Sequence, residues 1–182
     1  MTYELIKMGS LYLDGKPQPV PQVPIKEGDI PKYNGTGSIV IGNTVEGKAI
    51  TWVKPEGMNL LVANRAILCD VNMRHLSSNG FLHGKEISID GRPYLCRLLK
   101  VGLSRKVPNE WDKCLDIVGE DNDIWHYISM CFWGSEQVPG ATLSYACRGG
   151  YSARYWGSTA MWFSSNGHGF RPVLEPLLPK CA

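Results

Sequence analysis

The residues best suited to chemistry lie near the C-terminus, in the stretch CRGGYSARYWGSTAMWFSSNGHGFRPVLEPL that begins at Cys147. Residues 141–176 contain three tyrosines, two tryptophans, two phenylalanines and three arginines, among many glycines and serines. Aromatic residues interleaved with serine, glycine and asparagine are typical of antibody combining sites, where rigid rings supply contact area and small polar groups adapt. We therefore predict a recognition surface whose ligand-binding residues are Tyr151, Arg154, Tyr155, Trp156, Ser158, Trp162, Asn166 and His168.

Packing in the core is the alternative for the aromatic members of this set. Aromatic side chains usually pack, and every second position of a strand faces inward. Strand alternation predicts that Tyr155, Trp156 and Trp162 do not all face a ligand.

Five neighbouring residues are interpreted as scaffold. Glycine at 149 and 150 permits a positive φ or a close backbone approach where a strand bends. A rigid guanidinium fork suits Arg148 and Arg171 to pairing with carbonyls or carboxylates, and Phe170 is expected to fill the core. These residues are therefore expected to support the fold and to bind no ligand.

At RGGYSARYW and GFRPV the segment resembles the C-terminal half of C-type-lectin-like domains of the formylglycine-generating-enzyme type. It is also similar to the variable ligand-binding proteins diversified by retroelements, and to small proteins of phages and prophages. The last likeness extends from NLLVANRAILCDV through NEWDK to GFRPVLEPL. The resemblance implies a lectin-like fold in which residues 151–168 line the exposed binding face. Fold likeness alone does not fix a function.

Catalytic and cofactor motifs do not match this sequence. The resemblance implies a copper-binding cysteine pair, whereas the C-terminal segment offers only Cys147 and Cys181, so we do not carry the oxidase activity over. No histidine grouping indicates iron, no GxSxG elbow is present, and the glycine-rich stretches lack nucleotide-loop spacing. We predict a protein that is not an enzyme and has no metal site and no cofactor.

Composition limits the range of partners and compartments. A net charge of only +2 disfavours general nucleic-acid binding, which usually requires a large basic excess. No apolar run has the length of a signal peptide or a membrane span. We expect a cytoplasmic protein (in the host cell, if phage-encoded) with no membrane partner and with six free thiols.

The first 57 residues are predicted to form a β- and proline-rich arm. Residues 17–31 contain five prolines, a density that excludes helix and favours an extended path. The stretch SIVIGNTVEGKAITWV predicts two strands joined at a VEGK turn. Such an arm packs either on the core or on a neighbouring subunit, and because it has little of its own to bury we expect a homo-oligomer.

Residues 58–182 are predicted to form the lectin-like domain. Helices are expected over 72–79, capped by Asn72, over 109–118, capped by Asn109, and in a further short stretch over 123–132. Residues 85–102 predict a hairpin that turns at Asp90-Gly91. The expected fold class is α+β, a C-type-lectin-like fold with a twisted antiparallel sheet, the two short helices over 72–79 and 109–118, and the extended proline-rich N-terminal arm.

Two functions from different classes fit these observations. The first is a small-ligand sequestering protein that soaks up a nucleotide-like immune signal, with rings stacked on the base and Arg154 on phosphate. The second is a receptor- or carbohydrate-binding protein that recognises a host surface. A degenerate enzyme-like domain with a structural role is a third possibility. A concave pocket of ligand size favours the first function, and a broad shallow face favours the second.

Overall fold

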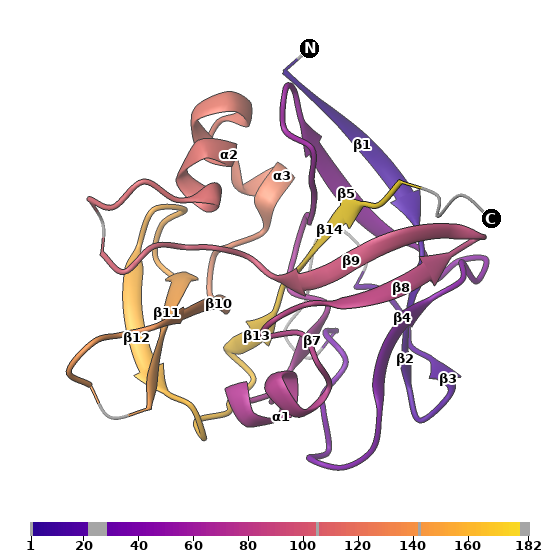
Figure 1. Cartoon of the computed structure of the whole chain (residues 1–182), viewed down its shortest axis with the longest axis horizontal. Helices are drawn as coiled ribbons and strands as arrows, with labels where there is room; N and C mark the ends of the chain where they lie inside the picture. Colours follow the sequence, from indigo (N-terminus) through magenta and orange to yellow (C-terminus); the bar gives the residue numbers. More distant parts are fainter. Residues whose placement is uncertain (1, 22–28, 105, 142, 179–182) are drawn as a thin grey trace.

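The computed structural model describes residues 2–21, 29–104, 106–141 and 143–178. The described chain is a mixed α+β fold of mostly antiparallel strands with three short helices (Figure 1). This much of the expected fold class is confirmed. Pro24, one of the prolines of the predicted arm, lies outside the described residues.

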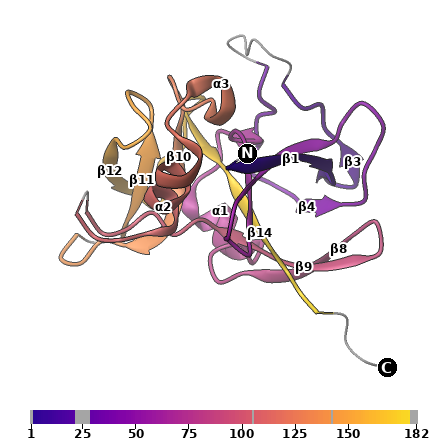
Figure 2. The same cartoon turned by 90° about the horizontal axis from the view of Figure 1, so that it is seen from above.

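The larger sheet has six strands, all paired antiparallel, in the order β1-β5-β6-β14-β9-β8. In Figure 2, β14 crosses the middle of the molecule. The strands are β1 (Tyr3–Met8), β5 (Ile50–Pro55), β6 (Leu61–Ala63), β14 (Pro172–Pro176), β9 (Arg92–Leu98) and β8 (Lys85–Ile89).

A second sheet of five strands has the order β12-β11-β10-β13-β7, in which β10 and β13 pair in parallel and the other pairs are antiparallel. Its strands are β12 (Trp156–Ala160), β11 (Ser144–Gly149), β10 (Cys131–Gln137), β13 (His168–Phe170) and β7 (Leu68–Cys69). The third sheet joins β3 (Lys16–Pro17), β2 (Ser10–Leu13) and β4 (Ile39–Gly42).

Two of the helices begin at the expected caps. The helix α1 (Met73–Ser78) starts after Asn72, whose side chain accepts from the His75 backbone N–H. The helix α2 (Glu110–Val118) starts after Asn109, which accepts from the Asp112 backbone N–H, and ends at Gly119. Short polar side chains satisfy backbone donors that a helix start leaves unpaired, which confirms both predicted starts.

The hairpin of β8 and β9 is also confirmed. Asp90 and Gly91 both have positive φ, at 51° and 79°, as a two-residue hairpin turn of the mirror-image type requires.

Strand alternation divides the interior into two cores. In β6 and β14, Leu61 and Leu174 face the first core, which contains Trp52, α1 and Trp133, while Val62 and Val173 face the second. The second core lies under α2 and α3 (Asn122–Trp125) and contains Trp111, Trp125, Phe132 and Ala146. Each core therefore contains residues from both the N-terminal and the C-terminal parts of the chain.

The first 57 residues are integrated with the rest of the chain. The two strands expected within 38–53 exist as β4 and β5, but they do not pair with each other: β4 pairs with β2, and β5 lies between β1 and β6. This segment buries Leu11, Ile39 and Trp52 in the first core. It therefore buries substantial apolar surface within its own chain, so the reason for expecting a homo-oligomer does not apply.

The helix expected over 123–132 is wrong over most of its length. The helix α3 stops at Trp125, and His126 and Ser129 have positive φ of 44° and 62°. The Asn122 side chain accepts from the backbone N–H groups at 127 and 128 and fixes this turn. Phe132 and Trp133 then face different cores, as neighbouring residues of a strand do.

The five described cysteines are all free, and Cys181 lies outside the described residues. Within the described ranges, no helix has the length and apolar character needed to cross a membrane.

Candidate functional site

The predicted recognition segment is divided between two ends of the five-stranded sheet. Because β11 and β12 are antiparallel, the loop 150–155 lies at one end, beside α2, and the loop 161–167 starts at the other, near α1 (Figure 1). Tyr151, Arg154 and Tyr155 belong to the first end, and Trp162 to the second. The structure does not bring the eight predicted residues together on one surface.

The loop 150–155 is held firmly against the core. Gly149 and Gly150 turn the chain with φ of 88° and 90°. Ala153 is buried, and its carbonyl accepts from the Trp111 indole N–H at 2.7 Å. From this anchored loop Tyr151 projects with 84% of its surface exposed, its ring 5.1 Å edge-on from that of Tyr155. A rigid loop that presents an exposed ring loses little conformational freedom when it binds.

A hollow of about 320 Å³ lies beside Tyr155. It is lined by Asp112, Arg148, Ser152, Arg154 and Tyr155.

The floor of the hollow is a buried ion pair. Arg148 donates from Nη2 to Asp112 Oδ2 at 2.8 Å and to the Val101 carbonyl at 2.7 Å. It also donates from Nη1 to the Arg154 carbonyl at 3.0 Å. The Arg148 side chain is 1% exposed, so its guanidinium ties α2, the loop and the segment after β9 together. These contacts are structural, and both side chains of the pair also line the hollow.

Arg154 lines the hollow and pairs with acidic side chains on α2 and just after its end. Its Nε is 2.5 Å from Glu120 Oε1 and its Nη2 is 2.7 Å from Asp116 Oδ1. Hydrogen bonds to Glu120 and Asp116 raise the pKa of Arg154, which therefore stays charged. Its Nη1 lies 3.6 Å from Asp112 Oδ1, too far for a good hydrogen bond.

The three carboxylates were not among the predicted site residues. Asp112, Asp116 and Glu120 recur every four residues, and side chains at this spacing share one face of a helix. That spacing, with Asp112 and Asp116 in the predicted helix and Glu120 just after its end, was the sequence feature that could have identified them.

At the other end of β12 the aromatic residues divide between surface and core. Trp162 is 52% exposed, and the Arg74 guanidinium lies 5.9 Å from its ring centroid. His168 is only 5% exposed, because it is enclosed between Trp133, at 4.3 Å, and Phe163, at 5.8 Å. Burial lowers the pKa of His168 to about 4, so its imidazole is neutral at pH 7. His168 is thus not available to a ligand in this conformation.

The remaining predicted residues occupy distinct places. Trp156 is half-buried against the second core and donates to the Gly102 carbonyl at 2.9 Å. Ser158 is exposed on β12, the edge strand of its sheet, and Asn166 is exposed in the loop 161–167. Neither contributes to the hollow beside α2.

Phe170 and Arg171 are fully buried. Arg171 donates to the carbonyls of Trp125 and His126, and its guanidinium lies 4.4 Å from the centroid of Phe132 and 5.1 Å from that of Trp111. Aromatic faces attract a cation, so these rings compensate part of the loss of hydration. Arg171 braces the second core.

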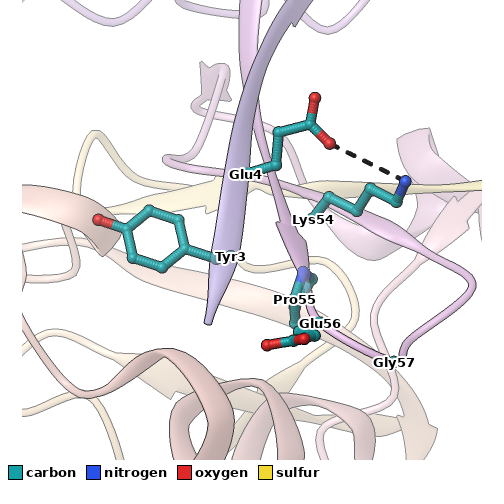
Figure 3. A pocket seen from close by; sticks show the side chains of 6 residues that line it. All are labelled: Tyr3, Glu4, Lys54, Pro55, Glu56 and Gly57. Carbon is teal, nitrogen blue, oxygen red and sulfur yellow. Dashed lines mark ion pairs between the residues drawn. The ribbon is translucent and has the colours of Figure 1, made fainter. Parts of the chain in front are cut away.

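A second hollow of about 310 Å³ lies at the start of β1 (Figure 3). Glu4 and Lys54 form an ion pair across 3.9 Å there, and the Tyr3 ring points away from them. Both charged side chains are at least half exposed, and exposed pairs of this kind contribute little energy. We therefore place the candidate site at the hollow beside α2.

Within the described parts of the chain, no three His, Cys, Asp or Glu side chains are grouped so that they could hold a metal ion. No protein-family model matches the chain, and comparisons with curated proteins and with solved structures also find no match.

Proposed function

We propose that this chain is a non-catalytic recognition domain that binds the surface of another protein through the loop 150–155 and the adjacent face of α2. The observation on which the proposal depends most is the exposure of Tyr151 on a loop anchored by Ala153 and Arg148. Tyrosine is one of the residues that most often dominate the binding energy of protein interfaces. Here Tyr151 projects from a rigid support.

A C-type-lectin-like arrangement is part of this proposal. Support comes from the five-stranded sheet, in which β10 lies between β11 and β13. The RGG sequence is at the end of β11, and the GF sequence is in β13. A surface-binding role is the use that the resemblance implies for such a frame.

Sequestering of a small nucleotide is the second candidate function. The hollow of about 320 Å³, lined by two arginines and Tyr155, is at the lower end of ligand-pocket sizes and favours it. Local charge counts against it, because Arg148 and Arg154 already face Asp112, Asp116 and Glu120. A phosphate would have to approach three carboxylates, and like charges repel. Protein recognition is therefore the better-supported function.

A selection from a random heptapeptide library tests the main proposal. We expect peptides that bind the wild-type protein and lose affinity about tenfold or more with Tyr151→Ala, the cost typical of an interface hot spot. Tyr3→Ala, at the other hollow, is the matched control and should bind normally. Peptides that bind both variants equally well would refute the proposed site.

Mass spectrometry of small molecules released from the heat-denatured protein tests the second candidate. A nucleotide recovered from the wild type and lost with Arg154→Gln would establish sequestering instead of protein recognition.

A further inference from the structure

The surface around the hollow is strongly acidic. Residues 110–123 contain six acidic side chains and one lysine, although the whole chain has a net charge of +2. Glu110 forms an ion pair with Arg97 at 2.7 Å, on the side of α2 that faces β9. Arg154 instead lies near Asp112, Asp116 and Glu120. These three carboxylates thus lie near the exposed Tyr151 and beside the half-buried Tyr155.

The chain's own arginine already occupies a cation position here. Arg154 meets three carboxylates from α2 and the residue after its end, while its side chain remains 40% exposed. Solvent screens such an exposed network, so each pair holds Arg154 only weakly. A guanidinium or ammonium group from outside can therefore compete for the same carboxylates.

One oxygen of the site lacks a hydrogen bond. Asp112 Oδ2 accepts from Arg148 and from the Asn109 side chain, at 2.8 Å and 2.6 Å. Oδ1 is buried and has no hydrogen-bond partner among the described residues, with Arg154 Nη1 3.6 Å away. A buried carboxylate oxygen is costly to leave unpaired, so a donor that reaches it gains binding energy.

We propose that the hollow accepts a basic side chain, arginine or lysine, from the partner protein, and that this side chain replaces Arg154 beside Asp112. The inference rests on the proposed function and names the chemistry of the partner. Tyr155 lines the hollow, so the incoming cation also meets an aromatic ring, which attracts cations, and the Tyr151 ring packs edge-on against that of Tyr155.

The direction in which Arg154→Gln changes the affinity for peptides tests this exchange. Arg154→Gln removes the internal competitor and leaves three carboxylates free, so we expect selected peptides to bind roughly threefold to tenfold more tightly. The double variant Asp116→Asn/Glu120→Gln should bind less tightly, and both changes lie at partly exposed side chains that the core does not need. Glu4→Gln, at the hollow of Figure 3, is the matched control and should leave affinity unchanged.

The peptides themselves provide the second readout. We expect a basic residue in the selected sequences, and replacing it with neutral citrulline or norleucine should weaken binding about tenfold or more. Peptides that need Tyr151 but contain no basic residue, or that bind Arg154→Gln more weakly, would overturn this inference and leave the proposed function intact. Peptides indifferent to Tyr151 would overturn both. Melting temperatures of all variants separate loss of binding from loss of fold.

Discussion

At the residue scale, Trp156 and Trp162 should behave differently although both belong to one aromatic segment. Trp156→Ala removes a half-buried ring and its bond to Gly102, so we expect a loss of about 2–3 kcal/mol in the free energy of unfolding. Trp162→Ala removes a largely exposed ring and should cost less than about 1 kcal/mol. Urea denaturation measures both, and equal losses would contradict the structure.

The buried histidines predict a dependence of stability on pH. Burial lowers the pKa of His168 from its ordinary 6.5 to about 4, and the pKa of His126, also chiefly by burial, to about 4. Between pH 6.5 and about pH 4, the unfolded chain protonates these histidines and the folded chain does not. The free energy of unfolding is therefore highest above pH 6.5 and falls as the pH drops toward 4. At about 1.4 kcal/mol per pKa unit, His168 alone should account for about 3 kcal/mol.

The His168→Leu variant isolates this contribution. Its loss of stability between pH 6.5 and 4.5 should be smaller than that of the wild type by about 2 kcal/mol. Identical pH profiles for the wild type and His168→Leu would show that His168 is solvated.

At the scale of the elements, the turn after β11 should be the most sensitive to substitution. Gly149 has φ of 88°, and an added Cβ would lie 2.5 Å from the Met130 carbonyl oxygen. Gly149→Ala should therefore cost more than about 3 kcal/mol, because a clash with backbone adds to the strain of a positive φ. Gly140→Ala is the matched control: φ is 75° but nothing lies within 4 Å, so only about 1 kcal/mol is expected. Thermal or urea unfolding of the two variants provides the comparison, and equal costs would be inconsistent with this packing.

Local signals allowed several elements to be predicted from the sequence. The caps Asn72 and Asn109 and the Asp90-Gly91 turn act through bonds within a few residues, so their effect does not depend on the rest of the fold. The stretch 123–132 was misjudged because its apolar residues suit a helix as well as a strand facing two cores. The pairing partners of β4 and β5 are distant in sequence, and no local pattern encodes them.

The candidate site could be predicted only in part. Composition indicates residues 151–168, of which Arg154 and Tyr155 line a hollow and Tyr151 packs against Tyr155. Composition could not show that β12 separates these residues from Trp162, or that His168 is enclosed. The carboxylates of α2 come from a different part of the chain, so their approach to Arg154 depends on tertiary packing.

At the scale of the whole molecule, the first 57 residues should be needed for folding. They supply β5, which lies between β1 and β6, and they bury Trp52, Ile39 and Ile41 in the first core. We expect the fragment 58–182 to lack a cooperative thermal transition by circular dichroism, because it would expose that core. A sharp transition with native-like near-ultraviolet signal would instead show that 58–182 folds independently.

Hydrogen–deuterium exchange of the protein with and without a selected peptide locates the binding surface. We expect slower exchange in the loop 150–155 and in α2 on binding, with no change in the loop 161–167 or at residues 54–57. Protection confined to 161–167, or to the hollow at the start of β1, would contradict the site beside α2.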